Sequence, residues 1–227
     1  MLAAVLPDTA RRFARAIVMP NLKRPVRSVS EADAYRGRIP AALPAGMDFE
    51  PLMSLYLTDG TLPAEILKAK GSGFVHAVKY YPAAATTNSD SGVTDIPRVD
   101  AALEAMHQAE LHLLLNGEVT DPGVNLFDRE ALFIERIPAL LLQRQPGLKV
   151  VLEHISTRQA AEFVATALGN VWATITAHHL LCNRNAMLHG GSRPHYYCLP
   201  TLKREIHREA LVCGRHRRQS QVLSGHV

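Results

Sequence analysis

The sequence predicts an incomplete (β/α)8 barrel with about six of its eight β/α units. Short apolar runs alternate along the chain with stretches of helical periodicity, an order typical of a parallel sheet with right-handed crossover helices. Polar residues follow each apolar run where the strand would end. A barrel brings such strand ends together at one site, whereas an open doubly wound sheet spreads them along an edge. No glycine-rich phosphate-binding motif favours the open sheet, so we favour the barrel.

The strands of this barrel are predicted from apolar runs that end at turn-forming or polar residues. They are expected at residues 14–19, 51–57, 74–80, 111–115, 149–153 and 171–176. A polar loop is expected at residues 82–97, and loops of this length often have a function.

The helices are predicted from their start and stop signals. Ser28 and Glu31 form a capping box that starts a helix running towards Leu43. Pro63 suits the first turn of a short helix that Gly71 ends. A further helix is expected at 98–109, and Asp128 and Thr157 are expected to cap two more.

Composition and charge argue against a nucleic-acid-binding, disulfide-stabilised, secreted or membrane protein. The formal charge of +4 is mild, and much of it comes from residues 203–218, so a basic face for nucleic acid is not indicated. Three cysteines without a CxxC spacing make a disulfide framework improbable and favour a reducing cytoplasm. The apolar start stops at Pro7, too early for a signal peptide, and the uncharged run 163–183 contains Asn and His residues that do not suit a membrane span.

Two residues at predicted strand ends are candidates for metal chemistry. Lys79 lies in an apolar strand, where a buried ammonium is costly, so the side chain either reaches solvent at the strand end or is neutralised. Conversion to a carbamate would make it a carboxylate that can bridge two metal ions. His154 follows another strand and is either a hydrogen-bonded structural histidine or a metal ligand. Asn21 suits a turn, and Thr86–Asn88 suit an ordinary polar loop, so neither feature by itself indicates a functional site.

Several short motifs together resemble the bacterial dihydroorotases, a family of amidohydrolases. The resemblance runs from Met1 to about Leu211. The motifs that carry it are Ala16–Asn21, Ala77–Pro82, Ala85–Asn88, Asn116–Val119, Phe127–Glu130, Glu153–His154, Ala173–Thr176, Asn183–Asn185, Arg193–His195 and Tyr197–Pro200.

The resemblance implies a (β/α)8 barrel, a homodimer and the reversible cyclisation of N-carbamoyl-L-aspartate to dihydroorotate in pyrimidine biosynthesis. In the family two zinc ions share a hydroxide that attacks the ring amide, and an aspartate carries the proton. Lys79 would be the carboxylated lysine that bridges the zinc ions, and His154 would bind one of them.

The substrate contacts are implied in the same way. Asn21 would bind the substrate carboxylate, Thr86 and Thr87 would close over the substrate from the loop, and the backbone of Leu199 would hold the pyrimidine ring.

The chain also departs from the family pattern. The family's His-x-His-x-Arg motif does not occur, and its catalytic aspartate would lie beyond Val227, so we expect no catalytic residue of the family to be retained. Asn116 stands where the family has a zinc-binding histidine, and an amide oxygen is a poor zinc ligand beside imidazole. Lys79 and His154 are therefore the two remaining groups of a set of six. We expect no appreciable dihydroorotase activity from the 227-residue chain.

The last residues suggest a division of the chain into a partial barrel at 1–211 and a divergent basic tail at 212–227. Codons can be chosen for Arg218–His226 that encode a different peptide when they are read one base forward. That peptide resembles the family's segment before its catalytic aspartate, so one hypothesis is that a frameshift produced this tail. An alternative to the enzyme is a non-catalytic homologue that serves as a partner subunit, for example of aspartate transcarbamoylase. Nucleic-acid binding through the tail is a third and weaker alternative.

Overall fold

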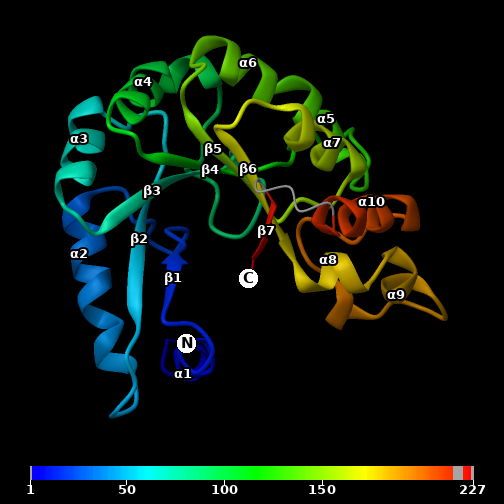
Figure 1. Cartoon of the computed structure of the whole chain (residues 1–227), viewed down its shortest axis with the longest axis horizontal. Helices are drawn as coiled ribbons and strands as arrows, with labels where there is room; N and C mark the ends of the chain where they lie inside the picture. The colour runs from blue at the N-terminus through cyan, green and yellow to red at the C-terminus, as the bar shows by residue number, and fades with distance from the viewer. Residues whose placement is uncertain (1, 217–221, 226–227) are drawn as a thin grey trace.

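A seven-stranded parallel sheet, curved into a half-barrel, forms the centre of the protein (Figure 1). The computed structural model describes residues 2–216 and 222–225. Strands β1 to β7 are neighbours in chain order, and each pairs in parallel with the next. Their bounds are β1 Arg15–Val18, β2 Glu50–Tyr56, β3 Val75–Tyr80, β4 His112–Asn116, β5 Lys149–Glu153, β6 Val171–Thr176 and β7 Val222–Gly225.

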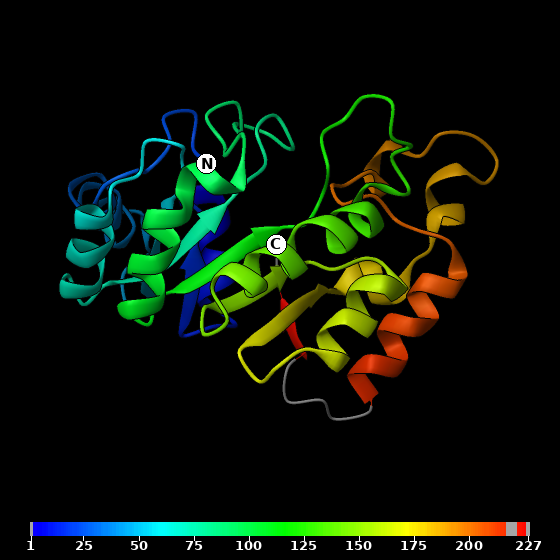
Figure 2. The same cartoon turned by 90° about the horizontal axis from the view of Figure 1, so that it is seen from above.

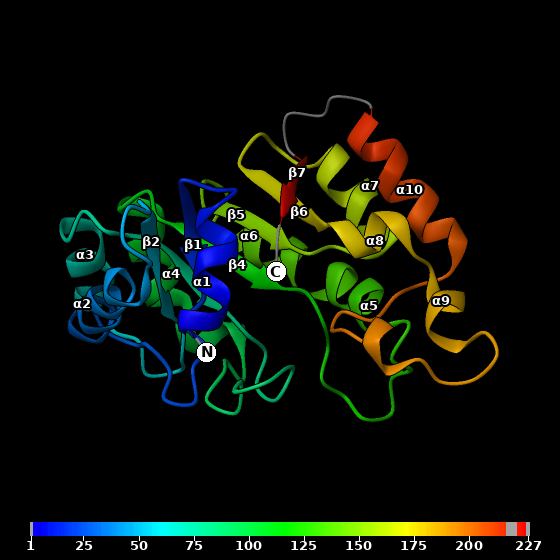
Figure 3. The same cartoon turned by 90° about the horizontal axis from the view of Figure 1, so that it is seen from below.

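Helices cover the convex face of the sheet (Figure 1). The α-helices are α1 Leu2–Ala10, α2 Val29–Arg38, α3 Pro63–Gly71, α4 Asp100–Gln108, α5 Arg129–Arg136, α6 Pro138–Arg144, α7 Arg158–Thr166, α8 Ala177–Leu181, α9 Arg184–Leu188 and α10 Glu205–His216. Short 3-10 helices lie at Pro40–Ala42, Ile96–Val99 and Pro194–Tyr196. Figure 3 separates the two ends of the sheet, with α1, α2 and β1 at one end and α7, α10 and β6 at the other.

The core lies between the sheet and the covering helices. Leu55, Val78, Leu113 and Leu152 come from four neighbouring strands, and all are at most 1% exposed. Parallel strands with buried residues on both faces appear as nearly continuous apolar runs, which is why the sequence pattern located them.

The long loops follow the carboxyl ends of the strands and lie on one side of the sheet. Figure 2 shows the loops after β3 and β4 and the segment between α9 and α10 on this side. The loop after β3 is joined to itself by a bridge between Pro82 and Val93. This is the edge at which a barrel of this type carries its functional residues.

The predicted strands and most of the predicted helix boundaries are confirmed. Ser28 Oγ accepts a hydrogen bond from Glu31 N at 3.3 Å, and Thr157 Oγ1 accepts one from Ala160 N at 3.2 Å, so both residues cap their helices. The helix from Ser28 ends earlier than predicted, at Arg38, because Pro40 interrupts it. Asp128 is at the start of α5 but makes no capping bond, since its backbone is already in the helical region and does not aim the carboxylate at the free amides.

The structure also contains elements that the sequence pattern did not indicate. Helix α1 continues through Pro7, α10 runs without interruption past residue 212, and β7 pairs with β6. Among the described residues, β1 and β7 form no pair with each other, so the sheet stays open. No helix in the described part of the chain is long and apolar enough to cross a lipid bilayer.

Candidate metal and substrate site

Lys79 is the central residue of the candidate site. Its side chain is 1% exposed, and its Nζ forms an ion pair with the carboxylate of Glu153. Lys79 on β3 lies beside Leu114 of β4, and Asn116 of β4 lies beside Glu153 of β5. The lysine therefore reaches across β4 inside the half-barrel and does not extend to solvent at the strand end.

Burial changes the acid–base chemistry of this lysine. It lowers the pKa of the Lys79 amine to about 7, because the ammonium loses its hydration. The ring of Tyr81 lies 5.1 Å from Nζ and supplies a further contact for the cation. At neutral pH a substantial fraction of the amine is uncharged, which is the form that reacts with carbon dioxide to give a carbamate.

His154 lies directly after β5, next to Glu153, in a conformation uncommon for a non-glycine residue. Its φ is 46°, in the left-handed region where non-glycine residues are strained and often functional. Its backbone N donates to Thr174 Oγ1 at 2.8 Å, which holds the turn. Burial, followed by the nearby charges of Lys79 and His179, lowers the pKa of His154 well below its usual value, so the ring is neutral and can offer a lone pair.

Buried polar atoms without a hydrogen-bond partner gather at the carboxyl ends of the strands. Among the described residues they are Tyr56 OH at the end of β2, Asn116 Nδ2 at the end of β4, Glu118 Oε1 just beyond it, and His154 Nδ1 after β5. An unsatisfied buried polar group costs roughly 1–3 kcal/mol and is uncommon in a native fold. Their concentration at one end of the half-barrel indicates a place where a polar ligand binds.

The donor set fits the expected metal only in part. His154 Nδ1 is free to bind a metal, and Lys79 would offer oxygen ligands once carboxylated. Asn116 is buried at this end of β4 but has an amide in place of an imidazole. A catalytic zinc takes three protein ligands and an open position, so these three residues do not complete a zinc site by themselves.

The position expected for the family's catalytic aspartate, beyond Val227, lies outside the described residues. The absence of a catalytic residue from the chain therefore stays a prediction.

The predicted substrate residues Asn21 and Thr87 are brought together. Asn21 Nδ2 donates to the carbonyl of Thr87 at 3.2 Å, and Asn88 Nδ2 donates to the carbonyl of Asn21 at 3.0 Å. The loop after β3 is thus joined to the turn after β1. Thr86 N donates to Ser89 Oγ at 2.8 Å within this loop.

Leu199, the other predicted substrate residue, lies in the segment between α9 and α10 and is partly exposed. Its peptide bond to Pro200 is cis. Within the described part of the chain, no hydrogen bond joins it to Lys79 or His154.

Three acids in or near the site have partners that the sequence pattern did not predict; Glu118 and Glu130 are buried, and Glu153 is partly buried. Glu153 pairs with Lys79, and the period of two along β5 could have revealed it as an acid at the interior end of that strand. Glu118 is 2% exposed with Oε1 4.0 Å from Lys203 Nζ, and burial raises its pKa to about 7. Glu130 on α5 accepts hydrogen bonds from the backbone and hydroxyls of Ser156 and Thr157.

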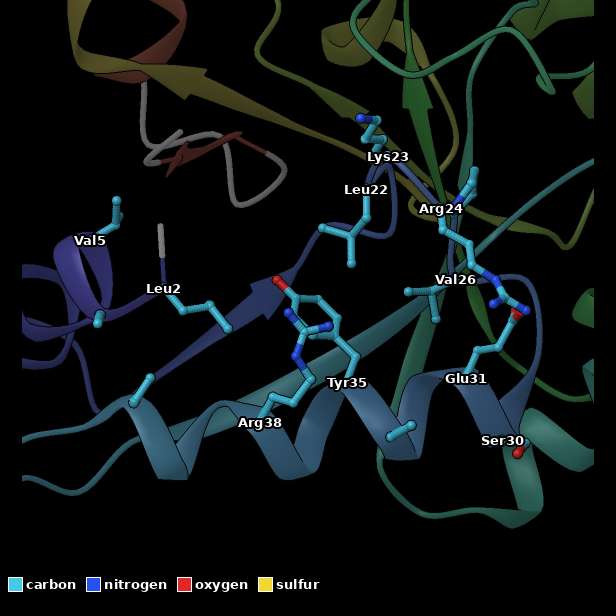
Figure 4. Close-up of a pocket in the computed structure, with 14 residues that line it drawn as sticks. Leu2, Val5, Leu22, Lys23, Arg24, Val26, Ser30, Glu31, Tyr35 and Arg38 are labelled. Carbon is cyan, nitrogen blue, oxygen red and sulfur yellow. The ribbon is translucent and has the colours of Figure 1, made fainter.

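A groove of about 1050 Å³ opens between α1, the segment after β1 and α2 (Figure 4). Leu2, Leu22, Val26 and Tyr35 give it apolar walls, and Arg38 lies at its side. None of the predicted site residues lines it, so the groove does not contribute to the candidate site.

Comparison with known proteins agrees with this geometry. The chain is 70% identical over 213 residues to a dihydroorotase of Cupriavidus taiwanensis, covering 94% of this chain and 62% of that protein. The crystal structure of a dihydroorotase from Campylobacter jejuni superimposes with a TM-score of 0.90 at 35% identity, over 98% of this chain and 64% of that one. The chain is similar to the dihydroorotases along nearly its whole length.

The wider comparisons define how far this similarity extends. The L-hydantoinase of Arthrobacter aurescens superimposes with a TM-score of 0.73 at 14% identity over 91% of this chain and 48% of that one, which shows a shared fold. No family model matches the chain. The chain spans about 62% of the length of the first curated dihydroorotases that it matches.

Proposed function

We propose that this chain is part of a zinc amidohydrolase that interconverts N-carbamoyl-L-aspartate and dihydroorotate in pyrimidine biosynthesis. The similarity to dihydroorotases supports the reaction class. The observation that carries the proposal is the group of unpartnered buried polar atoms at the carboxyl ends of β2, β4 and β5, beside a buried lysine of lowered pKa.

The proposed roles follow the positions of the residues. Lys79, once carboxylated, and His154 would hold metal inside the half-barrel. Asn21 would bind the substrate carboxylate, and its bond to Thr87 keeps it beside the loop that carries Thr86. The backbone of Leu199 would contact the pyrimidine ring from the segment before α10.

We expect the 227-residue chain alone to be inactive. Two metal-binding groups, Lys79 and His154, do not hold a catalytic zinc tightly, and Asn116 does not replace the third. The measurement is hydrolysis of dihydroorotate by the purified chain with added zinc. Turnover that requires zinc would contradict this expectation.

A segment exchange tests the proposed reaction itself. Residues 1–211 would replace the matching segment of a full-length curated dihydroorotase, once as they are and once with Asn116→His. We expect the Asn116→His chimera to be active. The chimera with Asn116 should be at least about 100-fold slower, because losing a residue that binds the metal directly reduces activity at least as much as losing a residue that hydrogen-bonds to such a ligand. Lys79→Met in the active chimera should abolish turnover.

The outcomes of the exchange separate clearly. An inactive Asn116→His chimera that folds and binds zinc would refute the proposed reaction. An equally active chimera with Asn116 would instead refute the assignment of residue 116 to the metal site.

A second candidate function rests on Asn116. An amide at a metal-ligand position is what a non-catalytic homologue would have, and such a homologue would act as a partner subunit, for example of aspartate transcarbamoylase. Co-purification of tagged chain with a transcarbamoylase from cells would support this function, and its absence, together with an active chimera, would dispose of it.

We further propose a homodimer, a cytoplasmic location without nucleic-acid binding, and a division at residue 212 between the partial barrel and a basic tail. All three cysteines are free thiols, which supports a reducing compartment. Helix α10 crosses residue 212, so this division would lie within a helix. Part of the proposed frameshift product, residues 217–221 and 226–227, lies outside the described residues.

A further inference from the structure

Three metal-binding side chains gather at the carboxyl end of β6. His178 and His179 lie on α8, directly after β6, and Cys198 comes from the segment before α10. The ligand atoms of the three residues all lie within 4.8 Å of one another, and within the described ranges no other group of at least three His, Cys, Asp or Glu side chains does so. We propose that His178, His179 and Cys198 form a binding site for a zinc-like divalent cation, separate from Lys79 and His154.

His179 is already oriented as a metal ligand. It is 3% exposed, and its Nε2 lies 3.0 Å from the carbonyl oxygen of Pro200. A carbonyl only accepts hydrogen bonds, so Nε2 carries the proton and Nδ1 keeps a lone pair. Metal-binding histidines commonly donate their other N–H to a carbonyl in this way, which fixes the ring and its tautomer.

The hydroxyl of Thr176 lies between the two imidazoles. Its Oγ1 is 2.6 Å from His179 Nδ1 and 3.1 Å from His178 Nε2. Because a hydroxyl has one proton, it donates to His179 Nδ1 and accepts from His178 Nε2. A cation at this point would bind both ring nitrogens in place of the bridging hydroxyl, with the proton of His178 moved to its other nitrogen.

Cys198 supplies the third ligand. It is a free thiol, half-buried, and its Sγ lies 3.2 Å from the carbonyl of Pro200, the same carbonyl that holds His179. Two imidazoles and a thiolate are a donor set that suits zinc and leaves a fourth position open. Zinc bond lengths place tetrahedral N and S ligands about 3.5 Å apart, so the ligand atoms must approach by roughly 1 Å. His178 and Cys198 are not fully buried and can rotate, while His179 stays fixed.

This site lies outside the proposed enzymatic function, because none of the three residues has a role in it. Its effect would be to join α8 to the segment that carries Leu199. Metal binding at His178, His179 and Cys198 therefore does not depend on the proposed reaction.

Cobalt(II) titration of the metal-free 227-residue chain tests the site. Cobalt takes zinc positions and gives a thiolate-to-metal charge-transfer absorption only when a cysteine sulfur binds it. We expect this absorption to saturate at one equivalent and zinc to displace it. Cys198→Ser should remove the absorption, and His178→Ala should weaken binding at least about 100-fold.

Matched variants separate this site from its neighbours. Cys182→Ser removes another partly buried thiol, at the end of α8, and should leave the absorption unchanged. His154→Ala should also leave it unchanged. Absorption that persists in Cys198→Ser, disappears in His154→Ala, or is absent from the natural chain would overturn the proposal. Circular dichroism of each metal-free variant shows that the comparison is between folded proteins.

Discussion

The buried pair of Lys79 and Glu153 leads to a prediction about stability and pH. The pKa of the Lys79 amine is about 7 in the folded chain and 10.5 when the lysine is exposed. One unit of pKa corresponds to about 1.4 kcal/mol, so holding the ammonium inside the barrel at low pH costs about 5 kcal/mol. The unfolded chain binds more protons than the folded chain between these two values. The free energy of unfolding therefore rises with pH across this window, by about 2 kcal/mol between pH 7 and pH 9.

The perturbation is the double replacement Lys79→Met with Glu153→Gln, which removes both charges and keeps the side chains of similar size. We expect the double variant to be at least as stable as the natural chain at pH 7, because replacing a buried ion pair by uncharged residues is commonly neutral or stabilising by about 1–4 kcal/mol. The advantage should shrink by about 2 kcal/mol at pH 9, where the natural lysine is already neutral. Glu153→Gln alone should change the stability at pH 7 by less than about 1 kcal/mol, because much of the amine is already neutral there and the rest can lose its proton when its partner is removed.

Urea unfolding followed by circular dichroism at pH 7 and pH 9 measures these differences, in metal-free buffer without bicarbonate. The matched control is the ion pair of Lys149 and Glu110, joined at 3.1 Å at the amino end of β5. Glu110 is exposed, so replacing this pair should leave both the midpoint and its pH dependence unchanged. If the natural chain and the Lys79→Met/Glu153→Gln variant show the same pH dependence, Lys79 does not titrate near neutral pH and the reasoning is wrong.

Three further predictions concern other positions. Glu130→Ala should be destabilising by about 3–5 kcal/mol in urea unfolding, because it leaves the amides and hydroxyls of Ser156 and Thr157 buried without their acceptor; an unfolding midpoint within error of the natural chain would contradict this. Gly92→Ala should expose the loop after β3 to limited proteolysis, since a Cβ there would lie 2.5 Å from a backbone oxygen of the preceding segment; unchanged cleavage would show that the loop can adjust. Asn116→His should increase the affinity of the chain for zinc in calorimetric titration by at least about 10-fold, because imidazole replaces an amide at the end of β4, and an equal affinity would place residue 116 outside the metal site.

The strands could be predicted because their signals are local. Residues 149–153 are apolar apart from their ends and lie between turn residues, and β5 occupies those residues. Strand β7 could not be predicted in this way, because Val222–Gly225 has only four residues, two of which are Ser and Gly. Its place in the sheet depends on pairing with β6, about fifty residues earlier in the chain, and no local pattern encodes such a pairing.

The candidate site could be predicted in part for the same reason. The apolar neighbours of Lys79 indicated a position inside a strand, but they left open whether the side chain reaches solvent or is buried. The answer depends on Glu153, 74 residues away, and on the register of the strand between them. The contact between Asn21 and Thr87 joins two loops and likewise depends on the completed fold. The cluster of His178, His179 and Cys198 could not be predicted, because the sequence spacing of these residues matches no metal motif.

Glu153 also determines what must happen at Lys79 before the lysine can serve as a metal ligand. As an ammonium, Lys79 has an opposite charge beside it and is stabilised. As a carbamate, it would carry a negative charge next to the same carboxylate, in a place with little water to separate them. A cation between the two groups turns this repulsion into attraction. Carboxylation and metal binding should therefore occur together, and a residue at position 116 that binds metal poorly should keep Lys79 in its ion pair with Glu153.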